Sequence, residues 1–325
     1  MLKWGIMATG AIANQFAETL LQMGDEVVLT AVASRNEENA KKFAEKFHAA
    51  KWYASYEELC KDNEVNVIYI ATPNSMHYEN CVQCLNHGKH VLCEKPLTLN
   101  AKDARSLYQI AKEKKLFIME AFWIKHLPLH KKMLEIVARG EIGEVKHIRA
   151  DYGFMTSKSK KRKFELSLGG GAIMDVGIYN IGFVWMVMKE KPKSFESKVT
   201  MNEYGTDEFS TVIFQFPGDK TATITTCIGM EIPTESVIYG TKGSIHFPNY
   251  HRAEKMYIKQ YGGKSYEIDM PFEINGFEYQ IRETNRCILE GRLESEVLTN
   301  RDSLEVLNIM DRIRSSWGLK FSVDE

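Results

Sequence analysis

The first 120 or so residues alternate short apolar runs with amphipathic stretches, and this alternation constrains the fold more than any other feature. Residues 3–7, 27–33, 65–71, 90–93 and 116–119 are apolar runs that predict buried strands, and most are followed by helical spacing. Strands that alternate with helices of this length predict a parallel, doubly wound sheet. We therefore expect an α/β architecture, with an N-terminal Rossmann domain over residues 1–122.

The turn after the first predicted strand has the context of a dinucleotide-binding turn. It contains Ala8, Thr9, Gly10, Ala11 and Ile12. Gly10 would let the backbone approach a pyrophosphate, and the N-terminus of the next helix would face that anion. Ala8 replaces the first glycine of the G-x-G-x-x-G pattern, so a plain tight turn remains an alternative.

The end of the second predicted strand indicates which dinucleotide binds. Sites that prefer NAD carry an acid there for the ribose 2′-hydroxyl, whereas this chain has Ser34 and Arg35. Arginine can bind a 2′-phosphate by paired hydrogen bonds, and serine can add another. We therefore predict NADP as the cofactor, with NAD possible. The alternative is that Arg35 only caps a surface turn.

Two later strand ends carry polar side chains at the same edge, because the carboxyl ends of parallel strands meet there. The first strand end is followed by Thr72, Pro73, Asn74 and His77, with Ser75 as a predicted helix cap, and the second by Glu94, Lys95 and Pro96. Apart from Ser75 and Pro96, we expect these residues to bind the cofactor, and Lys95 is thereby held near bound ligand. A solvated Glu–Lys pair at a strand end is the alternative.

Residues 123–325 predict a second, α+β domain with a large, mostly antiparallel sheet, because short alternating strands follow one another between residues 194 and 267. Before them, three glycines lead into a helix that contains Asp175 and Tyr179. These two residues are four apart and therefore share a helix face. A carboxylate and a phenol near Lys95 would form an acid–base group. The alternative is a capping aspartate with a core tyrosine.

Composition argues against several other classes of protein. The formal net charge is -1, which gives no reason to expect nucleic acid or a membrane as a partner. No apolar run is expected to reach the roughly 20 residues that span a bilayer. Scattered cysteines predict free thiols in the cytoplasm, and no metal site is expected, since Pro128 interrupts the helix between His126 and His130.

The basic run Lys158–Lys163 has two interpretations. It is either a solvated loop or a flank of the substrate site that favours an anionic or phosphorylated substrate. The sequence does not decide between them.

Several motifs together resemble one known family. They are Gly10 with its small neighbours, Ala71-Thr72-Pro73-Asn74-x-x-His77, Glu94-Lys95-Pro96 and Met119-Glu120-Ala121-Phe122-Trp123. The chain resembles the glucose–fructose oxidoreductase, inositol dehydrogenase and rhizopine catabolism family (Gfo/Idh/MocA) over effectively its whole length. Within this family, the motif Gly169-Gly170-Gly171-Ala172-x-x-Asp175-x-Gly177-x-Tyr179, together with the Met119–Trp123 stretch, resembles the dimeric dihydrodiol dehydrogenase and NADP-dependent D-xylose dehydrogenase branch. Lys125 and His126 stand where other members have arginine.

The resemblance implies roles for individual residues. It implies that Lys95 meets the reacting oxygen of a sugar-like substrate, that Lys95-Pro96 is cis, and that Tyr179 exchanges the proton while Asp175 positions substrate or cofactor. Trp123 is expected beside the cofactor. The implied function is hydride transfer between nicotinamide and a hydroxyl or carbonyl carbon of a sugar, polyol or cyclic diol, by a homodimer or homotetramer formed through the second sheet. A nicotinamide-binding sensor without turnover is the alternative.

Overall fold

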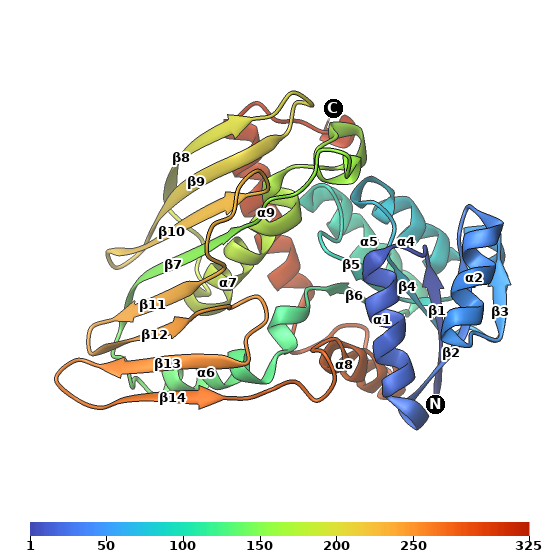
Figure 1. Ribbon diagram of the computed structural model, residues 1–325, viewed down its shortest axis with the longest axis horizontal. Helices are drawn as coiled ribbons and strands as arrows, with labels where there is room; N and C mark the ends of the chain where they lie inside the picture. Colours follow the sequence, from blue (N-terminus) through green and yellow to red (C-terminus); the bar gives the residue numbers. More distant parts are fainter. Residues whose placement is uncertain (325) are drawn as a thin grey trace. The chain divides into compact units, whose positions relative to one another are not determined.

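The computed structural model describes residues 1–324, which form two compact units (Figure 1). The first contains Met1–Trp123 and Glu273–Ser303, and the second contains Ile124–Phe272 together with the described residues from Leu304 onward. The boundary that we expected at residue 122 assigned Glu273–Ser303 to the second domain. In the structure, this segment packs with the first unit.

The first unit is built on a six-stranded, wholly parallel sheet in the order β3-β2-β1-β4-β5-β6. The strands are β1 (Leu2–Met7), β2 (Val27–Ala33), β3 (Lys51–Tyr53), β4 (Val67–Ile70), β5 (His90–Glu94) and β6 (Ile118–Ala121). The strand order reverses between β1 and β4, which is where such sheets bind ligands. The predicted Rossmann sheet is confirmed, although the three-residue β3 was not predicted.

Helices of the first unit accompany this sheet, and most of them are labelled in Figure 1. They are α1 (Ala11–Gln22), α2 (Glu37–Phe47), α3 (Tyr56–Lys61), α4 (His77–Asn86), α5 (Ala101–Lys114) and α8 (Glu278–Leu289). The Asn100 side chain caps α5 by accepting from Asp103 N at 2.8 Å. Ser75 does not cap α4 as predicted, because it lies inside a 3₁₀ turn, Asn74–Met76, and the residue before α4 is Met76.

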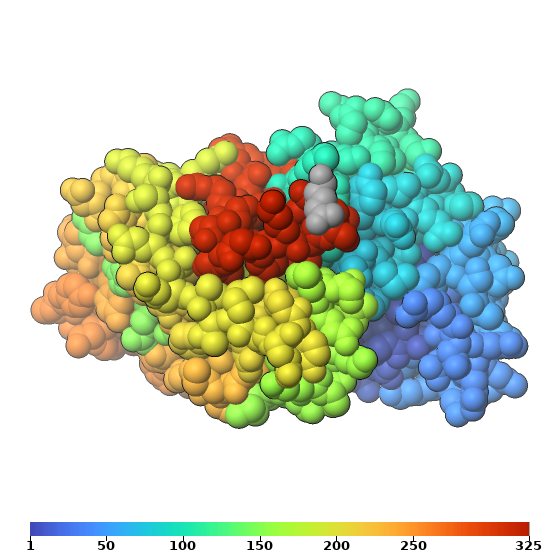
Figure 2. All heavy atoms as spheres, turned by 90° about the horizontal axis from the view of Figure 1, so that it is seen from above, coloured from blue at the N-terminus to red at the C-terminus, as the bar shows by residue number. Residues whose placement is uncertain are grey.

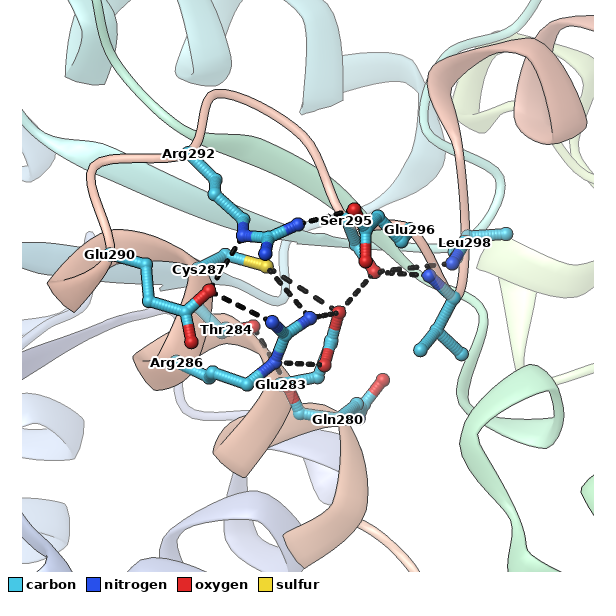
Figure 3. A network of polar contacts seen from close by, with 11 residues as sticks. Gln280, Glu283, Thr284, Arg286, Cys287, Glu290, Arg292, Ser295, Glu296 and Leu298 are labelled. Carbon is cyan, nitrogen blue, oxygen red and sulfur yellow. Dashed lines mark hydrogen bonds and ion pairs between the residues drawn. The ribbon is translucent and has the colours of Figure 1, made fainter.

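A polar network holds the returning segment Glu273–Ser303 together (Figure 3). Glu283 on α8 accepts hydrogen bonds from Arg286 at 2.9 Å and from Ser295 at 2.5 Å. The Ser295 hydroxyl also accepts from the backbone of Val297. Although burial opposes it, hydrogen bonding with Arg286 and Ser295 lowers the pKa of Glu283 to about 2. The ionised carboxylate therefore fixes the loop that leads to the next helix.

The second unit contains an eight-stranded sheet in the order β14-β13-β12-β11-β7-β10-β9-β8. Its strands are β7 (Val145–Gly153), β8 (Ser194–Met201), β9 (Asp207–Phe216), β10 (Lys220–Cys227), β11 (Ser236–Gly240), β12 (Gly243–Phe247), β13 (Lys255–Gln260) and β14 (Ser265–Asp269). Among neighbouring strands only β7 and β10 are parallel within the described residues. The expected large and mostly antiparallel sheet is confirmed.

Helices cover one face of this sheet. The helices are α6 (Pro128–Ala138), α7 (Ile178–Met188) and α9 (Asn300–Ser316), whose first residues belong to the first unit. On β9, Val212 and Phe214 are buried, whereas Ile213 between them is 45% exposed. Figure 2 shows the red C-terminal residues beside the yellow part of the sheet, where Trp317 Nε1 donates to Ser197 Oγ on β8 at 2.9 Å.

Pro128 does not interrupt a helix as we expected. It occupies the first turn of α6, where a missing N–H removes no intrahelical hydrogen bond. The histidine that follows it, His130, lies inside the core, between the rings of Phe183 and Phe247.

One stretch, Leu166–Met188, is long and apolar enough to span a membrane by length and composition. The expectation that no apolar stretch approaches this length is therefore wrong. However, 89% of its most apolar window is buried inside the protein, which is typical of a core helix. The stretch includes a π-helical turn, Ile173–Gly177, directly before α7. Such π-helical turns are frequent at functional sites.

Candidate active site

The turn after β1 combines a left-handed residue with an uncapped helix start. Ala8 has a φ of 83°, in the left-handed region that favours glycine. A Cβ atom built on Gly10 would meet no other atom within 4 Å, so the backbone is open to a ligand there. Ala11 and Ile12 begin α1, whose first turn contains no acidic residue and has no side-chain cap. An uncapped helix start of this kind can accept an anion at its first N–H groups.

Ser34 and Arg35 follow β2 beside this turn. Thr9 Oγ1 donates to Ser34 Oγ at 3.4 Å, which joins the ends of β1 and β2. Ser34 is buried, whereas Arg35 is exposed. Arg35 also lies against Tyr56: burial raises the pKa of the Tyr56 hydroxyl, and the charge and hydrogen bond of Arg35 oppose that effect. The guanidinium is therefore held near the strand end.

His77 supports the end of β4 from inside the core. Its Nδ1 lies 2.7 Å from the carbonyl oxygen of Pro96, and its Nε2 lies 3.0 Å from that of Thr72. The side chain is completely buried, and burial lowers the pKa of its imidazole. His77 thus ties the segment after β4, which includes Pro73 and Asn74, to the loop that carries Lys95.

The loop Lys95–Leu97, which we call the Lys95 loop, is held by hydrogen bonds between its main-chain atoms and neighbouring side chains. The Lys95-Pro96 peptide bond is cis, as expected. Lys95 N donates to Glu94 Oε2 at 3.2 Å, and Leu97 N donates to Glu120 Oε1 at 2.9 Å. Together with the contact between the Pro96 carbonyl and His77, these bonds fix three consecutive residues. The backbone that carries the amine of Lys95 is therefore tightly defined.

Two buried carboxyl groups flank Lys95. Burial raises the pKa of both Glu94 and Glu120, and the charge of Lys95 opposes the shift in each. Glu94 also accepts a short hydrogen bond from the Tyr69 hydroxyl, which acts in the same direction as Lys95. The two buried carboxyl groups and Lys95 therefore form one electrostatically coupled group at the end of the sheet.

Glu120 was not among the predicted site residues. Its Oε2 accepts a hydrogen bond from Ser303 Oγ at 2.7 Å, so the segment that returns to the first unit also supports the Lys95 loop. The position of Glu120 at the end of β6 was visible in the sequence, but its bond to Leu97 N was not. Nearby in the chain, Trp123 stacks on Phe277 with ring centroids 5.1 Å apart.

In the second unit, Asp175 and Tyr179 lie in an aromatic and charged cluster. Asp175 Oδ2 is 2.7 Å from Lys163 Nζ. The ring of Tyr179 lies 4.5 Å from that of His251 and 6.0 Å from that of Tyr152. Burial raises the pKa of Tyr152, and the charge of Asp175 raises it further. The charge of Asp175 therefore influences one of the aromatic rings that surround Tyr179.

Three features of the first unit fit the shape and the charge of a dinucleotide cofactor. The open space at Gly10, the uncapped start of α1 and the exposed Arg35 suit a pyrophosphate and a further phosphate. Within residues 1–324, no group of three or more His, Cys, Asp or Glu side chains is placed to hold a metal ion. His130 is a core residue whose side chain is completely buried, and this burial lowers the pKa of its imidazole to about 4.

The fold and these strand-end residues define a class of protein: a two-unit oxidoreductase with a Rossmann domain. Residues 2–122 match an oxidoreductase family with an NAD-binding Rossmann fold, and residues 130–246 match the GFO/IDH/MocA C-terminal domain. The chain belongs to the Gfo/Idh/MocA family of NAD(P)-binding oxidoreductases, as its motifs indicated.

Relatives with known names extend over the full chain. The chain is 35% identical to trans-1,2-dihydrobenzene-1,2-diol dehydrogenase of Xenopus laevis, over 98% of this chain and 99% of the relative. It is 31% identical to the human enzyme of the same name, over 100% of this chain and 99% of the relative. An aldose–aldose oxidoreductase from Caulobacter crescentus has a similar fold, with a TM-score of 0.88, 22% identity and 97% of each chain covered. A 3-ketoreductase variant from Actinomadura kijaniata also has a TM-score of 0.88, with 23% identity over 97% of each chain.

Proposed function

We propose that this oxidoreductase uses NADP and transfers a hydride to or from a carbon that bears the hydroxyl or carbonyl group of a sugar, polyol or cyclic diol. The observation that carries the proposal is the Lys95 loop, whose backbone is fixed by Glu94, His77 and Glu120. A lysine whose backbone is held so firmly at the ligand edge of a Rossmann sheet suits a reacting oxygen. The names of the relatives, which include diol dehydrogenases, support this substrate class.

The protein's residues bind the cofactor and move one proton. The residues that would hold the pyrophosphate, at the start of α1, are Ala8, Thr9, Gly10, Ala11 and Ile12. Ser34 and Arg35 would bind the 2′-phosphate. The rest of the cofactor would be held by Thr72, Pro73, Asn74, His77, Glu94 and Trp123, and it would supply the hydride.

Lys95 and Tyr179 act at the substrate oxygen. Tyr179 takes the proton of the hydroxyl as the carbon is oxidised, or returns it in the reverse direction. The ammonium of Lys95 stabilises the developing alkoxide, and Asp175 orients the substrate. His77 holds the loop of Lys95 in the position that this step requires.

The finer aspects of the proposal have separate support. The 3-ketoreductase of similar fold is described in complex with NADP. A homodimer or homotetramer is supported by exposed apolar residues on the sheet of the second unit, such as Ile213 and Tyr257. Free cysteines, including the Cys60 and Cys84 thiols 3.6 Å apart, suit a reducing cytoplasm.

A substrate screen tests the proposed function. The consumption of NADPH, or its formation from NADP, is followed by absorbance with aldoses, inositols, deoxy-ketoses and trans-dihydrodiols. Wild type should turn over at least one of these. The Lys95→Met variant should still bind NADPH but lose turnover, whereas Lys114→Met, which changes an exposed lysine of α5, should behave as wild type. Tight NADPH binding without turnover on any compound would instead support the sensor.

A further inference from the structure

Three of the five basic residues in the run Lys158–Lys163 are seen to pair with acidic side chains. These ion pairs are Lys158–Glu203 at 2.8 Å, Lys161–Glu165 at 3.3 Å and Lys163–Asp175 at 2.7 Å. The first two lysines are exposed, at 58% and 75%, so water screens those pairs. Lys163 and Asp175 are only 12% and 15% exposed. Lys163 and Asp175 therefore form the pair in which burial makes each charged side chain depend on the other for its stability.

The local fold brings Lys163 against Asp175, although the two residues are 12 positions apart in the sequence. The chain turns back through a glycine segment, where Gly171 N donates to Lys163 O at 2.9 Å and Asp175 N donates to Gly171 O at 3.0 Å. Gly171 has a φ of 114°, which side chains disfavour. The backbones of both charged residues are thus bonded to one glycine.

The ammonium group of Lys163 also contacts an aromatic ring. Lys163 Nζ lies 3.9 Å from the centre of the Phe154 ring, a favourable cation–π distance. The charge of Asp175 reaches Tyr152, whose ring neighbours Tyr179. Lys163 therefore belongs to the cluster around the proposed proton-transfer residue rather than to a solvated loop.

We propose that Lys163 is a specificity-determining residue that cancels the charge of Asp175 and so makes this half of the site selective for uncharged substrates. The inference rests on the proposed function, because it takes Asp175 as a residue that meets substrate. A neutral hydroxylated compound can bind beside the pair without disturbing it. An anion beside the pair meets a carboxylate whose counter-ion is already engaged, and it loses water without gaining a new partner. Removal of only one charge should therefore change which substrates are accepted.

The test uses three sugars that differ at one ring substituent: D-xylose, D-glucose and D-glucuronate, which carry hydrogen, a hydroxymethyl group and a carboxylate. The kcat/KM value for each is measured with NADP for wild type, Lys163→Met, Asp175→Asn and the double variant. The ratio of glucuronate to glucose is the readout, because a general loss of activity cancels in it.

Asp175→Asn should raise this ratio about tenfold or more, since the ammonium of Lys163 can then pair with the carboxylate of glucuronate instead of that of Asp175. Lys163→Met should lower it, and the double variant should return it to within about threefold of wild type, because charge balance is restored. Lys163→Arg keeps the charge and should keep the wild-type ratio. Lys160→Met, which removes an exposed charge from the same run, should change the ratio by less than about twofold.

Two results would overturn the inference. One is a ratio in Asp175→Asn within about twofold of wild type. The other is an equal shift in Lys160→Met and Lys163→Met, which would indicate general attraction by the loop. If wild type turns over none of the three sugars, the substrate class in the proposed function fails first. The affinities of glucose and glucuronate for the NADP complex, measured by calorimetry, then decide on Lys163: an unchanged affinity ratio in Asp175→Asn refutes it.

Discussion

Asp207 gives the most quantitative prediction about stability. This residue on β9 is completely buried, and its Oδ2 accepts a hydrogen bond from Ile173 N at 2.7 Å, at the start of the π-helical turn that contains Asp175. Burial raises the pKa of its carboxyl from 3.8 to about 7. The folded protein therefore keeps this group protonated under conditions in which the unfolded chain ionises it.

The sign of the effect on stability follows from proton linkage. Below about pH 4 the carboxyl is protonated in both states. As the pH rises from about 4 to about 7, the unfolded chain releases the proton while the folded protein holds it, so the free energy of unfolding decreases. Since each pKa unit corresponds to about 1.36 kcal/mol, the loss reaches about 4 kcal/mol above pH 7.

Asp207→Asn removes this contribution, because an amide does not titrate. We measure urea unfolding of wild type and variant by tryptophan fluorescence between about pH 4 and pH 8. The difference in unfolding free energy, variant minus wild type, should increase by about 4 kcal/mol over that range. Any constant cost of the amide cancels in this slope. Asp25→Asn, at an exposed position, is the control for the loss of one acidic side chain. A difference that does not vary with pH for Asp207→Asn would refute the reasoning.

Three further predictions concern the first unit. Ala8→Gly should stabilise the protein by up to about 1 kcal/mol in urea unfolding, because glycine adopts the φ of 83° without strain; equal or lower stability would contradict this. Glu120→Ala should lower kcat about tenfold or more with little change in NADPH affinity, and Glu120→Gln should restore most of the rate, because its amide oxygen still accepts from Leu97 N. A Gln variant as impaired as the Ala variant would show that the hydrogen bond is not the important feature. Arg35→Ala should raise KM for NADP about tenfold or more and leave KM for NAD nearly unchanged; an unchanged KM for NADP would remove the assigned contact.

The fold of the first unit follows from local sequence signals. Apolar runs bounded by helical spacing indicate a parallel sheet, and strand ends with polar residues share one edge because the strands are parallel. The cap at Asn100 follows from its side chain. The three-residue strand β3 and the short helix α3 were missed because elements of that length carry too few residues for a periodic pattern.

Contacts between distant parts of the chain could not be read in the same way. No local pattern indicates that Ser303 bonds to Glu120, or that α8 packs with the first unit. The pairing of Lys163 with Asp175 depends on the backbone conformation of Gly171, which a sequence of three glycines leaves open. The wider π-helical turn before α7 also has no sequence signal that we recognise.

The most direct test of the central claim is single-turnover transfer from NADPH deuterated at nicotinamide C4 to the carbonyl substrate found in the screen. Wild type should place deuterium on the product carbon, while Lys95→Met and Tyr179→Phe bind NADPH with unchanged affinity and transfer at least about a hundredfold more slowly. Transfer at nearly the wild-type rate in either variant would contradict the role of that residue in moving the proton.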